Sequence, residues 1–214
     1  MRKGLTLMEL LVVISILATL AALLYPVYLS VRTKMYAVSC ANQLRQIGLA
    51  IKMYVHDQGD ETPYSMPYSL GQLYPNYIHD KELLVCPYFR AIAPIGLIEG
   101  MHQRSQKRWK EPWSSYWLMC PKSLDEGWRR GDNMGFAPIF AKRGDATPIV
   151  FCDSHQQGCP NSNYSVMLHP EAQRFCGQNL FEPNAPMVIL RWGGSVSLVH
   201  KPSNVATDVI LMDY

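Results

Sequence analysis

Charged residues are missing from a long stretch near the start of the chain. Between Leu10 and Leu29 there is no charged side chain, and the stretch reads LLVVISILATLAALLYPVYL. Roughly 20 apolar residues in helical form span the hydrocarbon core of a bilayer, which is about 30 Å thick. The basic residues before this stretch are Arg2 and Lys3, which predicts a cytoplasmic N-terminus and an exported remainder.

The sequence also lacks the patterns of familiar catalytic sites. It contains no nucleophile elbow, no phosphate-binding glycine loop and no pair of carboxylates in a convincing context, so we predict no enzymatic activity and no cofactor. The formal net charge is only +3, which gives no reason to expect a nucleic-acid partner.

Dense metal-binding motifs are absent as well. Residue types that bind zinc occur, without zinc-finger spacing, at Asp153, His155, Cys159 and His169. Aspartates that would suit calcium, but form no D-x-D-x-D array, are Asp145, Asp153 and Asp208. We therefore predict no metal site.

An aromatic and basic segment follows in the middle of the chain. Its aromatic residues are Trp109, Trp113, Tyr116, Trp117 and Trp128, and basic residues are interleaved with them. Such a mixture can bind nucleic acid or sugar by stacking and charge. The alternative is a set of core aromatic residues beside a solvated basic face, and that is the interpretation we favour.

A long helix is predicted from near Leu5 to about Asp57. Pro26 lies inside it and predicts a kink or a short melted stretch, because proline removes a backbone donor. Beyond the apolar stretch, one helical face is apolar at Cys40, Leu44, Ile47, Ile51 and Tyr54. Gly59 is expected to end the helix.

The remainder, residues 58–214, is predicted to form a globular head with an α+β fold and a small, mostly antiparallel sheet. The expected strands are Trp113–Cys120, Thr147–Cys152, Pro186–Trp192, Ser195–His200 and, as a last edge strand, Val209–Met212. Gly193 and Gly194 suit a two-residue hairpin turn. Tyr88–Pro112 shows little periodicity and is expected to be a loop or a short helix.

Six cysteines lie beyond the apolar stretch, and an even number in an exported chain favours disulfides. They are Cys40, Cys86, Cys120, Cys152, Cys159 and Cys176. A Cys40–Cys86 bond would tie the helix to the head, and Cys152 or Cys159 is expected to pair with Cys176. Buried thiols are the alternative.

The first residues, MRKGLTLMELLVVISILATLAALLYP, resemble the N-terminal signal of type IV pilins and type II secretion pseudopilins. A short basic leader, residues 1–4, ends in Gly4, and Leu5 stands where the family more often has phenylalanine. Glu9 and Pro26 also match positions of the family pattern. A cleaved secretory signal is the alternative, but its apolar region would be shorter.

The resemblance implies a processing and assembly route. A prepilin peptidase would cut between Gly4 and Leu5 and methylate the new amine, Glu9 would help to recruit a subunit, and the apolar helices would form the core of a filament. Independently, a carboxylate near the end of a membrane helix costs about 1–3 kcal/mol unless it is paired or shallow. The amine on Leu5 would lie four residues before Glu9, on the same face. Alternatively, Glu9 is solvated at the headgroups.

A second, looser resemblance extends further along the chain. CANQLRQIGLAIKMYVHD at Cys40–Asp57, LVCP at Leu84–Pro87 and MVILRWGGSVSLV at Met187–Val199 look like bacterial pilin-like proteins with a C-terminal hairpin. That family has a short Asp-Gly-His motif at the hairpin. Here the turn reads RWGGS, so no role of that Asp or His can be transferred.

These features predict a structural subunit, anchored by one helix (about residues 5–29) in the inner membrane before assembly, with its head outside the cytoplasm. Its expected partners are further copies in a helical filament, which would be extracellular or periplasmic, the prepilin peptidase, and a pilus or secretion assembly machinery. A type II secretion pseudopilin is the close alternative. A membrane-tethered binding domain that never polymerises is an alternative of another class.

Overall fold

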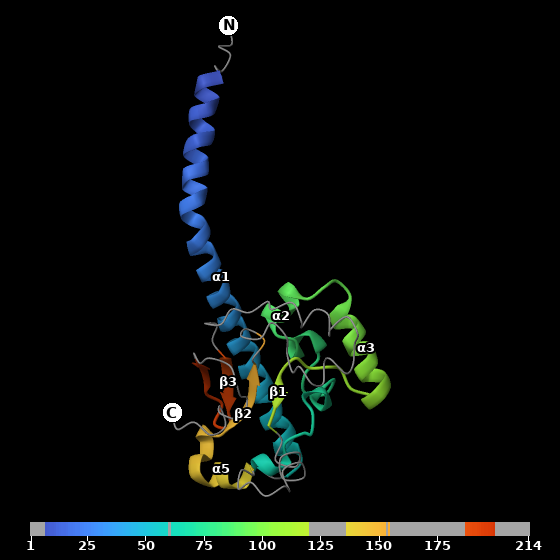
Figure 1. Ribbon diagram of the computed structural model, residues 1–214. Coiled ribbons are helices and arrows are strands. Elements are labelled where there is room, and N and C mark those ends of the chain that lie inside the picture. Colours follow the sequence, from blue (N-terminus) through green and yellow to red (C-terminus); the bar gives the residue numbers. More distant parts are fainter. Residues whose placement is uncertain (1–6, 60, 120–135, 153, 155–186, 200–214) are drawn as a thin grey trace, which may run out of the picture. The chain divides into compact units, whose positions relative to one another are not determined.

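A computed structural model describes residues 7–59, 61–119, 136–152, 154 and 187–199 (Figure 1). The chain divides into two compact units, residues 1–36 and residues 37–214, and we term the second the head unit. The elements follow in the order α1 (Leu7–Asp57), η1 (Pro63–Ser65), η2 (Leu70–Leu73), η3 (Lys81–Leu84), α2 (Pro87–Ile92), α3 (Leu97–Trp109), β1 (Trp117–Leu118), α5 (Phe136–Arg143), η4 (Gly144–Ala146), β2 (Pro148–Cys152), β3 (Met187–Arg191) and β4 (Val196–Val199), where η marks a 3₁₀ helix. Helices followed by an antiparallel sheet confirm the predicted α+β class.

The long helix α1 is uninterrupted. The helix continues through Pro26, so the melted stretch that the proline led us to expect is absent. An interior proline removes one backbone hydrogen bond and crowds the carbonyl four residues earlier, and the many other hydrogen bonds of this 51-residue helix offset that cost. The helix ends as predicted at Gly59, whose φ of 73° is left-handed and whose N–H donates to the carbonyl of His56 at 2.9 Å.

The last part of α1, from Ala37 onward, belongs to the head unit and buries one face. The predicted apolar stripe is confirmed at Cys40, Leu44, Ile47 and Ile51, each completely buried. Tyr54 is only half-buried, and Val55 takes the next buried position. This face of α1 is therefore part of the core of the head unit.

Four antiparallel strands form one sheet in the order β1-β2-β3-β4. Strand β3 lies against α1, since a Cβ atom added to Gly48 would come within 3.1 Å of the Leu190 side chain. Side chains alternate between the two faces of a strand, so Val188 and Leu190 share the face toward α1. On the opposite face a second cluster joins Met119, Phe151, Met187 and Ile189.

The hairpin β3–β4 was predicted correctly, but its turn is longer than expected. The N–H of Arg191 donates to the carbonyl of Ser195, so three residues rather than two form the loop. The N–H of Gly194 donates to the carbonyl of Arg191, and Gly194 has a φ of 87°. This combination is the type I turn followed by a left-handed residue that is common in three-residue hairpin loops.

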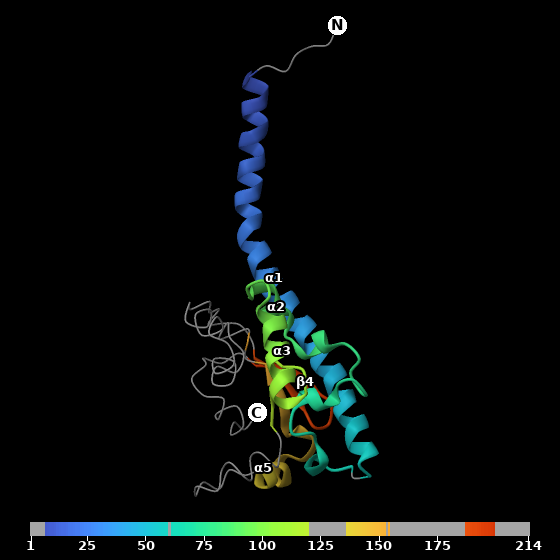
Figure 2. The ribbon, with the colours of Figure 1, turned by 90° about the vertical axis from the view of Figure 1, so that its right-hand side faces the viewer.

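Our expectations for residues 88–119 were met only in part. Tyr88–Pro112 contains two helices, α2 and α3, which lie on one side of the head unit (Figures 1 and 2). The predicted strand Trp113–Cys120 is reduced to the two residues of β1. The reason is that Ser115 donates its N–H to the carbonyl of Leu84, at 3.0 Å, and is thereby held outside the sheet. The predicted strand Val209–Met212 lies outside the described residues.

Candidate functional site

The apolar N-terminal segment is the first candidate site. Gly4 and Leu5, where processing is predicted, lie outside the described residues. Glu9 lies in the first turn of α1, and Pro26 lies inside the same helix. Every residue from Leu7 to Tyr28 is exposed, although this stretch of 22 residues is long and apolar enough to cross a membrane.

This exposure distinguishes the segment from an ordinary core helix. A core helix of a soluble protein passes the same test of length and composition, but it is mostly buried, whereas none of Leu7–Tyr28 is buried. At a rise of about 1.5 Å per residue, 22 residues extend roughly 33 Å, which matches the core of a bilayer. The segment therefore presents an apolar surface on all sides that requires a lipid or protein environment.

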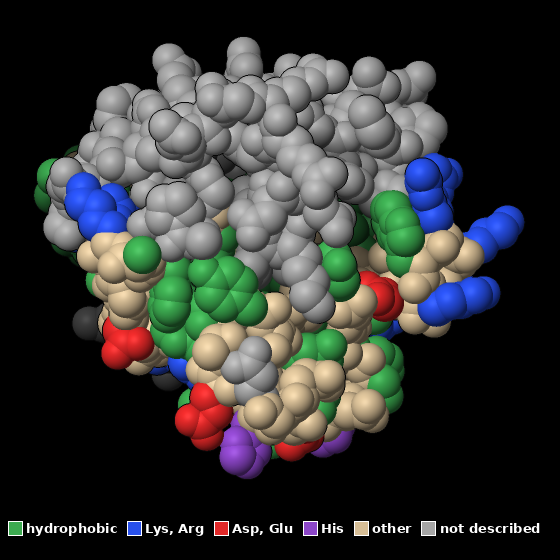
Figure 3. Space-filling view, turned by 90° about the horizontal axis from the view of Figure 1, so that it is seen from below, with side chains coloured by type: hydrophobic (Ala, Val, Ile, Leu, Met, Phe, Trp, Pro, Cys, Tyr) green, Lys and Arg blue, Asp and Glu red, His purple; other side chains and the backbone are tan. Residues whose placement is uncertain are grey.

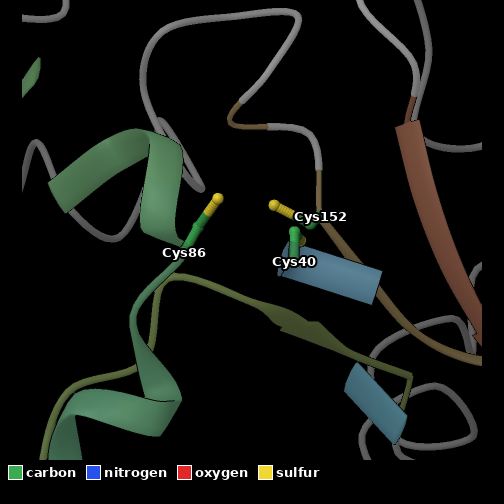
Figure 4. Close-up of side chains that lie close together, drawn as sticks. All are labelled: Cys40, Cys86 and Cys152. Carbon is green, nitrogen blue, oxygen red and sulfur yellow. The ribbon is translucent and has the colours of Figure 1, made fainter. Parts of the chain in front are cut away.

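Three cysteines meet in the head unit and form a second candidate site. Cys40 comes from the buried face of α1, Cys86 immediately precedes α2, and Cys152 is the last residue of β2. Their sulfur atoms all lie within 4.8 Å of one another, and all three residues are completely buried (Figure 4). We term these three residues the cysteine cluster.

Local structure explains why each cysteine points into the cluster. Cys40 belongs to the apolar stripe of α1. Cys152 pairs with Val188, whose side chain lies on the face of the sheet toward α1. The backbone N–H of Cys86 donates to the hydroxyl of Ser115 at 2.7 Å, which fixes the chain just before Pro87 begins α2.

The surroundings of the cluster disfavour charge. Burial raises the pKa of the Cys40 and Cys152 thiols well above the usual range, so both are neutral at pH 7. Burial, and then the neighbouring thiols, also raise the pKa of Tyr116. The Tyr116 hydroxyl donates to Oε1 of Gln43 at 2.6 Å. Three sulfur atoms at such distances can serve either as ligands of a soft metal ion or as partners in a disulfide.

The structure describes three of the six cysteines for which disulfides were predicted. Cys120, Cys159 and Cys176 lie outside the described residues. No disulfide joins the three cysteines that are described, and the pairing stays a prediction. Cys40 and Cys86 lie close together, but sequence reasoning missed that Cys152 joins them. Side chains alternate between the two faces of a strand, so the position of Cys152 beside Cys40 and Cys86 follows once the pairing of β2 with β3 is known.

The aromatic and basic middle segment is divided between core and surface. Trp113 is buried against Phe89 and His102, and Trp117 stacks on Phe151 at 5.6 Å between ring centroids. Trp109 is partly exposed, and the guanidinium of Arg108 lies over its ring. Figure 3 shows Lys and Arg side chains gathered on the right-hand side of the head unit, where Figure 1 places α3. Among the four that are described, Trp113, Tyr116 and Trp117 therefore serve the core, and Trp128 lies outside the described residues.

Of the residues considered for metal ions, only Asp145 lies in the described part of the chain. Asp145 is exposed, and its backbone carbonyl accepts from the N–H of Gly193 at 2.9 Å. That close approach requires glycine at position 193, where an added Cβ would lie 2.9 Å from the Asp145 side chain. The other residues, Asp153, His155, Cys159, His169 and Asp208, lie outside the described residues.

Residues 1–25 match the family model of the prokaryotic N-terminal methylation motif. No curated protein and no solved structure matches the chain. Together, the motif and the exposed apolar helix indicate anchoring in a membrane before assembly. The first of the two resemblances is thereby confirmed, because the chain carries at its start the signal of type IV pilin-like and pseudopilin precursors. The second, looser resemblance stays a prediction.

Proposed function

We propose that this chain is a structural subunit of a type IV pilus-like filament, assembled through α1 after a prepilin peptidase has removed residues 1–4. The observation that carries the proposal is the exposure of every residue of Leu7–Tyr28, a stretch that lies mostly within the methylation motif at residues 1–25. Cleavage between Gly4 and Leu5 would leave this apolar helix on the mature chain. The apolar helix must therefore be covered by lipid or by protein both before and after assembly.

Two environments can cover the helix in turn. Lipid covers it while the subunit is anchored in the inner membrane, and helices of other copies cover it in the filament. Moving between two apolar environments gains little hydrophobic free energy, so close packing and polar contacts must provide the specificity of assembly. Glu9 is the acidic residue in the first turn of α1 and is suited to provide such a contact.

Glu9 is proposed to pair with the methylated amine on Leu5 of a neighbouring copy. A carboxylate near the end of a membrane helix costs about 1–3 kcal/mol unless it is paired or shallow, and a cationic amine would offset that cost. Because each copy carries one amine and one Glu9, the contact would repeat along the filament and set the axial spacing of the subunits.

Pro26 is proposed to let α1 adapt as the copies pack. Proline cannot donate a backbone hydrogen bond, so the carbonyl of Ala22 lacks its usual helical donor. Bending is easiest at such a position, and the helix around it is nevertheless intact. The residue would thus permit a bend without requiring one.

The close alternative is a pseudopilin of a type II secretion system, which would use the same processing and the same contacts in a short periplasmic fibre. The measured length of the fibre, and the identity of the machinery that assembles it, separate these two functions. The alternative of another class is a tethered binding domain, for which Glu9 would be dispensable.

The decisive experiment replaces Glu9 in the full chain, expressed together with its assembly machinery. We expect Glu9→Gln to reduce the filament fraction sheared from cells at least tenfold, while the amount of subunit in the membrane is unchanged. Glu61→Gln is the matched control, because Glu61 is an exposed carboxylate of the head unit, with a side chain that is 87% exposed. Filaments at the original level in Glu9→Gln would exclude the proposed role of Glu9, whereas a complete absence of filaments from the unsubstituted chain would favour the tethered domain.

Mass spectrometry of the membrane-bound chain tests the processing step separately. We expect a mature N-terminus at Leu5 that carries one methyl group on its amine. An intact Met1, or a cut after Ala22 that removes the apolar helix, would contradict the proposal.

A further inference from the structure

The cysteine cluster links three elements that are far apart in the sequence: α1, the start of α2 and the end of β2 (Figure 4). We propose that Cys40, Cys86 and Cys152 act as one redox unit, in which a disulfide joins two of the three and the third remains a buried thiol able to exchange with it. The inference rests on the proposed export of the head unit, which would place the cysteines where disulfides form and persist.

The charge of the cluster favours a disulfide over a metal ion. Soft ions bind thiolates, so Cu(I) or Zn(II) held by three cysteines would leave one or two net negative charges in a completely buried site. The groups that act on the Cys40 thiol are, among the described residues, Cys152, Cys86 and Tyr116, and none of them is a cation. A disulfide is neutral and weakly polar, so burying it carries no such cost.

The geometry allows any of the three pairs to bond. A disulfide requires a sulfur–sulfur distance of about 2.05 Å, and χ1 rotation with small backbone shifts can bring together sulfur atoms that start within 4.8 Å. Each pairing connects two different elements: α1 with α2, α1 with β2, or α2 with β2. Every pairing therefore cross-links two elements within the head unit, and two of the three pairings link α1 covalently to another element of it.

The oxidation needs an external disulfide, supplied outside the cytoplasm by a thiol oxidase or a small-molecule disulfide. One cysteine thiolate attacks a sulfur of that disulfide and releases one thiol, which leaves a mixed disulfide on the protein. A second cysteine thiolate attacks the protein sulfur of the mixed disulfide and releases the second thiol. The two electrons pass to the external disulfide, and the two cysteine protons end on the released thiols.

The third cysteine needs no oxidant to exchange with this bond. Its thiolate attacks one bridging sulfur, a new disulfide forms, and the displaced cysteine leaves as a thiolate that takes up the proton. Burial holds the pKa of Cys40 and Cys152 well above the usual range, so the attacking thiolate is scarce in the folded head unit. Exchange is therefore slow in the folded protein and rapid once the cluster is opened, which keeps the pairing stable after folding.

The first test maps the cysteines of the full, exported chain, purified in detergent without reducing agent. The chain is alkylated before and after unfolding and digested with trypsin plus a protease that cleaves before aspartate, because Asp153 separates Cys152 from Cys159. We expect peptides that link members of the cluster, and one member that is alkylated only after unfolding. Bonds from the cluster to Cys120, Cys159 or Cys176 would overturn the proposal.

The second test removes the cysteines in turn, in a chain whose Cys120, Cys159 and Cys176 are replaced by serine. We expect Cys40→Ser, Cys86→Ser and Cys152→Ser each to retain one disulfide between the two remaining cysteines after treatment with oxidised glutathione. The double variant Cys40→Ser/Cys86→Ser is the control and should form none within the chain. If two of the three single substitutions abolish the bond while the head unit still melts cooperatively, the pair is fixed and exchange is excluded.

Metal analysis of the same purified chain provides a third outcome. One copper or zinc ion per chain, with all three cysteines protected from alkylation until a chelator is added, would replace the disulfide by a metal site. None of these measurements depends on filaments, and Glu9→Gln should carry the same disulfide. A failure of assembly and a failure of the cysteine cluster are thus distinguishable.

Discussion

The two halves of α1 belong to one continuous helix, yet their side chains have opposite surroundings. Every residue of Leu7–Tyr28 is exposed, whereas residues 37–57 bury a continuous face against the head unit. The difference lies in the arrangement of apolar residues. In the first half they occupy all sides of the helix, while in the second half they recur at helical spacing between polar residues such as Arg45 and Lys52.

This comparison shows that one continuous helix can have one part suited to an apolar environment and another part suited to the surface of a folded head unit in water. The second half has one apolar face, which the sheet of the same chain covers, and one polar face for water. The first half has no polar face, and none of the described residues covers it. The two halves should therefore respond to substitution through different observables: folding of the head unit for the second half, and membrane retention or assembly for the first.

The largest expected effect is on the buried half. Leu44 is completely buried, so Leu44→Ala should destabilise the head unit by about 2–5 kcal/mol through lost burial and a residual cavity. Thermal unfolding of the full chain in detergent, followed by circular dichroism, measures this. Leu49→Ala is the matched control, because Leu49 lies on the same helix but is 67% exposed, and its cost should stay below about 0.5 kcal/mol. Equal losses for the two variants would remove the distinction between the faces.

The converse experiment places a charge in the exposed half. Leu17→Arg, near the middle of Leu7–Tyr28, should raise the free energy of membrane insertion by about 2.5–3.5 kcal/mol. Alkaline extraction of membranes should release more of this variant than of Leu17→Ile, while the melting of the head unit is unchanged in both. A loss of head stability in Leu17→Arg, without a change in membrane retention, would contradict the assignment of this half to lipid.

A third experiment sharpens the description of the covered face. Gly48→Ala places a methyl group 3.1 Å from the Leu190 side chain, and overpacking of this kind costs about 1–3 kcal/mol. Alanine favours the helix over glycine by about 1 kcal/mol, so the net destabilisation should be near 1 kcal/mol. Leu190→Val makes room, and the double variant should be more stable than the sum of the two single changes predicts. Strict additivity would mean that α1 and β3 do not meet at this point.

The sequence predicted the features of α1 and of the hairpin because each is encoded over a few adjacent residues. The helix ends at Gly59, where a left-handed residue was expected, and the buried stripe follows the spacing of Leu44, Ile47 and Ile51. The N-terminal motif is also local, and the family model matches it over residues 1–25.

Features that depend on distant partners could not be predicted in this way. Helix α3 is largely polar and is held by the burial of Leu97, Met101 and His102, which only the folded head unit provides. The pairing of β2 with β3 determines whether the Cys152 side chain lies on the face of the sheet toward α1. The cysteine cluster therefore could not be predicted from the spacing of the cysteines along the chain. Sequence reasoning recognised the cysteines as partners of one another but could not place three of them together.

The smallest expected effect lies at Lys52, beside the buried face of the second half of α1. This position gives a sensitive test of the difference between the two halves. The ammonium of Lys52 lies 3.2 Å from the centroid of the Trp192 ring, which favours the charge, while partial burial disfavours it and lowers the pKa of Lys52. Because these effects oppose each other, Lys52→Gln should destabilise the head unit by only about 0.5–1 kcal/mol. Lys34→Gln is the control, since exposed Lys34 lies in the other compact unit and should leave thermal unfolding unchanged. If Lys34→Gln lowered the melting temperature as much as Lys52→Gln, the stabilisation of the head unit would extend beyond residue 37, and the boundary between the two halves of α1 would lie nearer the N-terminus.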